Sequence, residues 1–166
     1  MTDRYQALRG GESRFECEVD GFMVSTDRSR FDLEMIHGWL RDHSYWARGI
    51  PREVVERAIA NSLPFGLFAA DRQIGFARVI TDFATYGYLS DVFVLESHRG
   101  QGGSKALMAA VMAHPELGEL RRWGLVTADA QELYRKFGFV GIEEPGRYME
   151  IVRKDIYLTT KGETEP

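Results

Sequence analysis

Apolar residues recur in this chain at two spacings, one typical of helices and one typical of strands. The helical spacing covers Phe31 to Asp42 and the segment that begins after Pro51. It returns in a segment that ends near His114, where Pro115 disfavours helical geometry for the residue before it. We therefore predict two consecutive helices in the first half of the chain and a third helix that stops before Pro115.

The other apolar runs are short and bounded by turn residues, which is typical of strands. The predicted strands are Phe22 to Ser25, Leu63 to Ala70, Gln73 to Thr81, Tyr86 to Leu95, Trp123 to Thr127, Phe139 to Ile142 and Tyr148 to Arg153. A short helix, from Ala130 to Phe137, is predicted to end at Gly138. The order of elements is thus one strand, two helices, three strands, helix, strand, helix and a closing pair of strands.

Length, charge and cysteine content limit what the protein can be. The 166 residues suit one domain, predicted over residues 21–158, with an N-terminal arm at 1–20 and a charged tail at 159–166. The net charge of −4 gives no basic field for nucleic acid or an anionic membrane. There is no apolar run of the roughly 18 residues needed to span a bilayer, and no secretion signal. Because Cys17 is the single cysteine, we expect a protein of the reducing cytoplasm.

A basic, glycine-rich turn, Arg99 to Gly103, follows the strand that ends near Leu95 and leads directly into the third helix. Glycines let a phosphate approach the backbone, and the N–H groups and positive dipole of a helix N-terminus attract anions. The nucleotide-hydrolase loop needs a Gly-Lys pair, which is missing here, and the dinucleotide fingerprint needs glycine where this chain has Lys105. The turn therefore predicts an anion site of another kind.

The turn resembles the pyrophosphate loop of the GCN5-related N-acetyltransferases, the GNAT family. That loop has Gln or Arg, then Gly three residues later, then Gly or Ala two residues after that. Arg99 and Gly102 match, and Ser104 departs from the pattern with another small residue. The preceding Asp91 to Val94 is similar to the family's fourth strand. A second block about 30 residues further on also resembles the family, with Ala130, Leu133, Tyr134, Lys136, Gly138 and Phe139 at its fixed positions.

This resemblance implies a fold class, an activity and a cofactor. The fold would be a mixed α/β (α+β) domain with a central, mostly antiparallel sheet flanked by helices. The activity would be N-acetyl transfer from acetyl-CoA, by direct attack of a primary amine in a ternary complex. The implied coenzyme A contacts are Val92, Phe93, Val94, Arg99, Gly100, Gln101, Gly102, Gly103, Ser104, Lys105 and Thr127. Thr127 replaces an asparagine common in the family, and Asp129 is the other polar candidate there.

The resemblance also suggests catalytic residues. Tyr134 stands where many members carry the general acid that protonates the departing thiolate, whereas a core aromatic is the other interpretation. Asp91 is the first candidate for the general base that deprotonates the amine, and Glu96 is the second. Ordered water molecules serve as the base in many members.

The sequence says less about the residues that bind the acceptor than about those that bind the cofactor. Tyr45 and Trp46 lie in the part of the chain that usually walls the acceptor site in the family, although both could pack onto the sheet instead. The histidines lack the spacing of metal ligands, so we predict no metal. The acceptor would be a small-molecule or peptide amine, and a homodimer is one of the oligomeric states left open. Alternatives are another acyl-CoA donor, a protein N-terminus as acceptor, or a catalytically idle acyl-CoA sensor.

Overall fold

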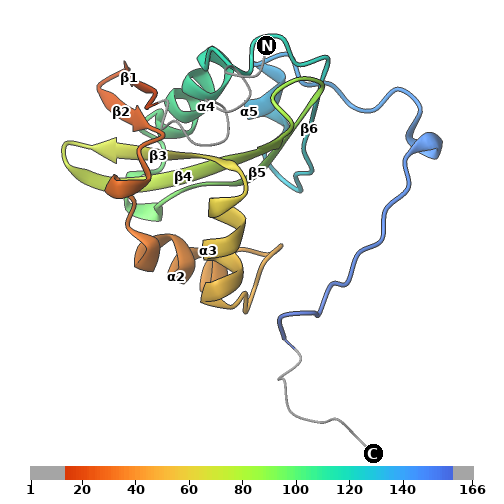
Figure 1. The fold of residues 1–166 in the computed structure, drawn as a ribbon, viewed down its shortest axis with the longest axis horizontal. Helices are drawn as coiled ribbons and strands as arrows, with labels where there is room; N and C mark the ends of the chain where they lie inside the picture. The colour runs from red at the N-terminus through yellow and green to blue at the C-terminus, as the bar shows by residue number, and fades with distance from the viewer. Residues whose placement is uncertain (1–13, 159–166) are drawn as a thin grey trace, which may run out of the picture. The chain divides into compact units, whose positions relative to one another are not determined.

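The structure, a computed structural model, describes residues 14–158, so the predicted tail and most of the predicted arm lie outside the described residues. The helices and strands follow one another in the order seen in Figure 1. They are β1 (Glu16–Val19), β2 (Phe22–Ser25), α2 (Leu33–His43), α3 (Arg52–Ala60), β3 (Leu63–Ala69), β4 (Arg72–Thr81), β5 (Tyr86–Val94), α4 (Gly103–Ala113), β6 (Arg122–Gly124) and α5 (Gln131–Arg135). Short 3-10 turns lie at Arg28–Arg30, Glu96–His98 and Pro145–Arg147.

The described strands form one six-stranded mixed sheet in the order β1-β2-β3-β4-β5-β6. All neighbours pair antiparallel except β5 and β6, which are parallel. The parallel pair needs a crossover, and α4 lies in that connection. The fold class predicted from the sequence, a mostly antiparallel mixed sheet with helices, is confirmed.

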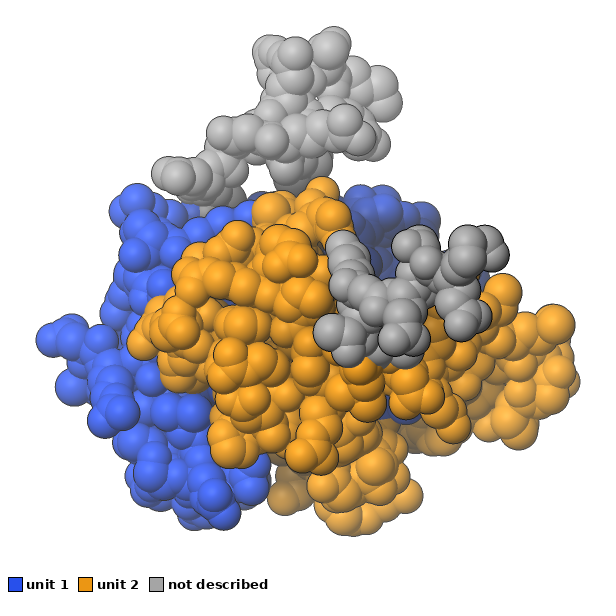
Figure 2. All heavy atoms as spheres, turned by 90° about the horizontal axis from the view of Figure 1, so that it is seen from below, with its two compact units in different colours: residues 1–31, 62–126 blue, residues 32–61, 127–166 orange. Residues whose placement is uncertain are grey.

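The chain divides into two compact units, coloured separately in Figure 2. Unit 1, residues 1–31 and 62–126, contains the whole sheet and α4. Unit 2, residues 32–61 and 127–166, contains α2, α3 and α5. The single domain predicted over residues 21–158 stays a prediction.

Helix α4 forms the core of unit 1 with the sheet and contacts strands β1 to β5. Its buried residues are Gly103, Ala106, Leu107, Met108, Ala110 and Val111. A Cβ on Gly103 would come within 3.0 Å of Leu67 Cδ2 and 3.6 Å of Val94 Cγ1. The missing side chain therefore lets the start of α4 lie close against β3 and β5, which fixes the helix N-terminus beside the end of β5.

Two helices of unit 2 follow the sequence closely. Asp32 caps α2 by accepting a hydrogen bond from the Met35 amide at 2.9 Å, and Pro51 precedes α3. The His37 ring lies 3.1 Å from the carbonyl of Ile50 and so links α2 to the segment before α3. The predicted helical pair is confirmed.

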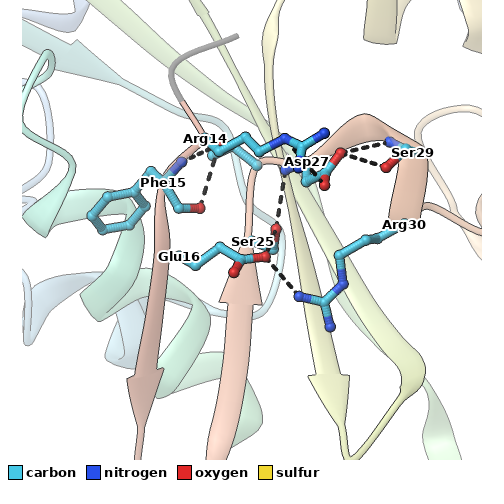
Figure 3. A network of polar contacts seen from close by, with 8 residues as sticks. Arg14, Phe15, Glu16, Ser25, Asp27, Ser29 and Arg30 are labelled. Atoms are coloured by element: carbon cyan, nitrogen blue, oxygen red, sulfur yellow. Dashed lines mark hydrogen bonds and ion pairs between the residues drawn. The ribbon is translucent and has the colours of Figure 1, made fainter.

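The predicted arm is wrong at its C-terminal end, because Glu16–Val19 pairs with Phe22–Ser25 as β1. Figure 3 shows the polar contacts at this hairpin. The Glu16 carboxylate accepts from Ser25 Oγ at 2.8 Å and from Arg30 Nη1 at 2.7 Å. The charged side chain of Glu16 thus has partners on β2 and on the turn that follows it, a pairing that apolar periodicity does not reveal.

The predicted closing strands, Phe139–Ile142 and Tyr148–Arg153, are also wrong, since neither is a strand in the described residues. Val140, Met149 and Ile151 are almost fully exposed there. Residues of high strand propensity form a strand only where another strand accepts their backbone hydrogen bonds, and the described residues offer none to this segment. The strand predicted at Trp123–Thr127 is shorter than expected, because β6 ends at Gly124.

None of the helices in residues 14–158 has the length and apolar character needed to cross a membrane.

His114 ends α4 inside the core of unit 1. Its Nδ1 accepts a hydrogen bond from the Glu116 amide at 3.3 Å, and its Nε2 is buried without a partner among the described residues. The rings of Phe15 and Phe65 lie 4.9 and 5.6 Å from the imidazole. Burial lowers the pKa of His114 from 6.5 to about 4, so the folded protein keeps this ring neutral.

We predict an acid-dependent loss of stability from His114. The unfolded chain takes up a proton on this ring below pH 6.5 and the folded chain only near pH 4. The free energy of unfolding should therefore fall as pH falls through that window, by about 1–3 kcal/mol from this group. Urea unfolding at pH 7 and pH 4.5 should show a smaller difference for His114→Leu than for the parent. His43 is exposed, so His43→Gln should keep the parental difference in unfolding free energy between the two pH values. If His114→Leu also keeps that difference, the prediction is wrong.

Candidate active site

Strand β5 carries an extra residue opposite β4. Phe76 pairs with Phe93 and Arg78 with Ser90, so the single residue Ala77 faces two residues, Asp91 and Val92. Asp91 has φ 54°, in the left-handed region that is uncommon for residues other than glycine. The result is a β-bulge, which bends the strand and changes the direction of the backbone that follows it.

Strand β5 also extends beyond its pairing with β6. The parallel ladder pairs Tyr86, Gly87 and Tyr88 with β6 and stops there, whereas β5 continues to Val94. Beyond Tyr88 the two strands no longer form a ladder in unit 1. The backbone of Val92 to Val94 therefore lies beyond the end of the β5–β6 ladder, after the bulge and before the glycine loop.

The glycine loop leads from this strand end into α4. Gly100 and Gly102 have φ of 75° and 90°, and a Cβ on either would meet nothing within 4 Å. The open space above both glycines is what a phosphate needs to reach the backbone. Gly102 is the N-cap of α4 and offers no side chain to cap it.

The electrostatics at the start of α4 favour an anion. The first turn contains no acidic residue, and among the described residues the amides of Gly103, Ser104 and Lys105 make no hydrogen bond. Lys105 is exposed on that turn. Arg99 Nε donates to the Val94 carbonyl at 3.3 Å, which ties the arginine to the end of β5. The amides, the positive end of the helix dipole and the cations Arg99 and Lys105 thus all belong to the glycine loop and the first turn of α4.

Asp91 is not an isolated carboxylate. Its Oδ2 lies 2.5 Å from Nε of Arg78 on β4, and Ser90 Oγ is 3.3 Å from its Oδ1. The side chains of Arg78 and Asp91 are 14% and 9% exposed. The general-base role predicted for Asp91 is not tested by this geometry, but the ion pair occupies one of its oxygens.

Tyr134 lies on α5 in unit 2 and is buried, with the Phe139 ring 6.0 Å away in an edge-on arrangement. Its hydroxyl oxygen is not among the buried side-chain atoms that lack a hydrogen-bond partner in the described residues. Burial, with smaller contributions from Tyr45 and Asp129, raises the pKa of Tyr134 from 10.0 to about 12. The phenol is therefore a proton donor that stays protonated throughout the neutral range.

The predicted acceptor residues form an aromatic cluster in unit 2. The Trp46 ring lies 5.7 Å from Trp39 and 4.9 Å from Tyr45, and Trp46 is 41% exposed. The Tyr45 hydroxyl accepts a hydrogen bond from the Ala128 amide at 2.9 Å. Next to it, Thr127 Oγ1 accepts from the Ala130 amide at 3.0 Å and so helps to start α5.

The predicted site residues thus fall into two groups. Unit 1 brings together Asp91, Val92 to Val94 and the loop from Arg99 to Lys105, and unit 2 brings together Tyr45, Trp46, Thr127 and Tyr134. The sequence reasoning missed Arg78, although a charged residue inside the apolar run of β4 was a signal that it needs a partner. Among residues 14–158 there is no group of three or more His, Cys, Asp or Glu side chains that could hold a metal ion.

Comparison with known proteins gives a consistent result. Residues 60–141 match the family model described as an acetyltransferase (GNAT) domain. A provisionally assigned acetyltransferase of Gibberella zeae is 31% identical over an alignment of 136 positions, and the alignment covers 69% of this chain and 76% of the relative.

Solved structures agree with that result. A provisionally assigned GNAT acetyltransferase from Xanthomonas campestris pv. campestris is 51% identical with a TM-score of 0.81, over 83% of this chain and 97% of that chain. A Clostridium acetobutylicum protein, described as a predicted acetyltransferase and solved with acetyl-CoA, shares the fold at 14% identity and a TM-score of 0.54, over 79% and 94% of the two chains.

The residues matched by the family model include both the glycine loop and the block around Tyr134. The extent and identity of the Gibberella and Xanthomonas matches are far above a likeness of fold alone. The resemblance found in the sequence is confirmed, and the chain belongs to the GNAT family of acetyltransferases.

Proposed function

We propose that this protein transfers the acetyl group of acetyl-CoA to a primary amine, carried by a small molecule or a peptide. One observation in unit 1 carries the proposal. The bulged strand β5 leaves the β6 ladder and runs into a glycine loop whose helix presents open amides. That arrangement suits a long ligand with a neutral amide-bearing arm and an anionic pyrophosphate.

The residues present fit coenzyme A, because the space above Gly100 and Gly102 is open and the start of α4 is uncapped. Acetyl-CoA would supply the acetyl thioester. The amides from Gly100 to Lys105 would hold the pyrophosphate, with Arg99 and Lys105 adding positive charge. The backbone of Val92 to Val94 would bind the pantetheine arm.

We propose direct attack by the amine, without an acyl-enzyme. The one cysteine, Cys17, lies on β1, which three strands separate from β5 in the sheet order. Burial raises the pKa of its thiol, which lowers the fraction of nucleophilic thiolate. A single reduced thiol also fits the cytoplasm, which we propose as the compartment.

Two proton transfers accompany the reaction. An alkylammonium with a pKa of about 10.4 must lose a proton before it can attack, and Asp91, Glu96 or water are the candidate acceptors. The departing thiolate must gain a proton, and Tyr134 is the proposed donor. Its raised pKa keeps the phenol protonated at neutral pH.

A direct test is turnover with a panel of acceptors. Acetyl-CoA would be mixed with amines, aminoglycosides, polyamines, amino acids and peptides, and released coenzyme A would be measured by its free thiol. We expect thiol release with at least one class. Tight coenzyme A binding with no turnover on any acceptor would favour the sensor alternative instead.

Our first site prediction concerns Gly102→Asp. A carboxylate and a Cβ at this position would repel the pyrophosphate and fill its path, so acetyl-CoA should no longer raise the melting temperature. In the parent, acetyl-CoA at 100 times its Kd should stabilise the fold by about 2.7 kcal/mol.

Gly21→Asp is the matched control, because Gly21 also has a left-handed φ, 82°, and open space around its Cβ. Both variants should lose about 1–2 kcal/mol of stability from backbone strain. Only Gly102→Asp should lose the response to acetyl-CoA. A parental response in Gly102→Asp would refute the proposed pyrophosphate site.

Trp46 gives a prediction about the acceptor. If its exposed face binds the acceptor, Trp46→Ala should raise KM for the best amine of the panel by about tenfold, the value of roughly 1.4 kcal/mol of lost contact. The Kd for acetyl-CoA, measured by calorimetry, should stay within about twofold of the parent. A collapse of acetyl-CoA affinity would show that Trp46 serves the cofactor or the core.

Tyr134→Phe tests the proton donor. The substitution removes one oxygen and little volume, so it should change the free energy of unfolding by about 1 kcal/mol or less. Loss of proton donation should lower kcat by roughly 10²–10⁴-fold, with little change in the Kd for acetyl-CoA.

The pH dependence should follow from the raised pKa of Tyr134. In the parent, no fall of kcat caused by this phenol is expected below pH 10, because it ionises only near pH 12. Tyr148→Phe, which removes an exposed phenol, is the control and should keep the parental kcat. A Tyr134→Phe enzyme with parental kcat would show that the side chain only packs.

A further inference from the structure

An ion pair joins β4 and β5 at the bulge. Arg78 Nε lies 2.5 Å from Asp91 Oδ2, and Arg78 Nη2 lies 3.4 Å from Ser90 Oγ. The Ser90 hydroxyl in turn donates to Asp91 Oδ1 at 3.3 Å. The guanidinium, on the neighbouring strand, therefore contacts Ser90 just before the bulge and Asp91 within it.

The place of this pair in the sheet is specific. Arg78 pairs with Ser90, the last regular position before the extra residue, and Asp91 is the residue with the left-handed φ. Phe76 and Phe93, whose rings are 6.3 Å apart, restore the register on the other side. The bulge thus lies between an apolar pair and an ion pair.

The two charges depend on each other. Arg78 and Asp91 are largely removed from water, and a buried charge without a partner is costly. Arg78 and Ser90 are cross-strand partners, so their side chains share one face of the sheet, and in a regular strand the side chain of Asp91 would point to the other face. The ion pair and the left-handed conformation therefore support one another.

We propose that Arg78 is a positioning residue for acetyl transfer. Through Asp91 it fixes the bulge, and the bulge sets the direction in which Val92 to Val94 present their backbone to the pantetheine arm. This inference rests on the proposed function and extends it to a residue outside the family's loop. It also gives Asp91 a role as the partner anion, in place of the general base.

The experiment compares two ligands that share the pyrophosphate. Coenzyme A contains the pantetheine arm, and 3′-phosphoadenosine 5′-diphosphate lacks it. Calorimetry on Arg78→Met should show coenzyme A binding at least tenfold weaker than in the parent and binding of the fragment within about twofold. Arg78→Lys should recover part of the coenzyme A affinity, because it keeps the charge with a different donor geometry. Arg72→Met, on the same strand but exposed, should bind both ligands like the parent.

The double variant Arg78→Met/Asp91→Asn separates positioning from stability. It contains no unpaired charge, and asparagine tolerates the left-handed conformation as aspartate does. Its melting temperature should recover towards the parent, whereas coenzyme A binding should stay at least tenfold weaker. Parental coenzyme A affinity in the double variant would overturn the proposal.

The pH dependence of kcat/KM distinguishes a positioning role of Asp91 from a role as general base. Positioning predicts that Asp91→Asn and Arg78→Met lower kcat/KM by similar factors and that both keep the parental fall of kcat/KM at acid pH. Loss of that fall in Asp91→Asn alone would assign Asp91 as the base and overturn its positioning role. A parent that binds neither ligand would instead overturn the proposed function, on which this inference rests.

Discussion

One extra residue in β5 sets the geometry on which the candidate site depends. An antiparallel ladder continues in register only if each strand contributes one residue at a time, and β5 contributes two opposite Ala77. The strand must therefore change direction between Ser90 and Phe93. It does so after its pairing with β6 has ended and before the glycine loop begins. The backbone beyond the end of the β5–β6 ladder is thus the backbone whose direction the bulge sets.

Helix α4 makes the other half of the site rigid. Its buried face packs on the sheet along its length, and the missing side chain of Gly103 lets its first turn approach Leu67 and Val94. Helix dipoles act only within the first turn, so an anion site needs this turn to be held in place. The packing of α4 supplies that constraint, and Gly100 and Gly102 keep the approach open. Neighbouring glycines thus serve two needs, since Gly103 lets the helix pack closely and Gly100 and Gly102 leave space for an anion.

Features that depend on residues close together in the sequence were predicted correctly. The loop, the end of α4 before Pro115 and the cap at Asp32 follow from residues near in sequence, and all are found where expected. The bulge and the Arg78–Asp91 pair depend on register between strands, which one strand's pattern does not contain. The prediction of two closing strands was wrong for a related reason. Val140 and Ile151 have side chains that suit a strand, but their segments have no strand to pair with among the described residues.

The arrangement of β5 lets the same residues serve the core and the ligand. Side chains of a strand point to the two faces of the sheet, whereas its N–H and C=O groups lie along the edges. Phe93 and Val94 bury their side chains, so their backbone remains the part that a cofactor arm could bind. Recognition of the acyl donor then makes little demand on side-chain identity. The acceptor, in contrast, would meet side chains such as that of Trp46 in unit 2. A conserved donor and a variable acceptor are therefore what this division of contacts allows.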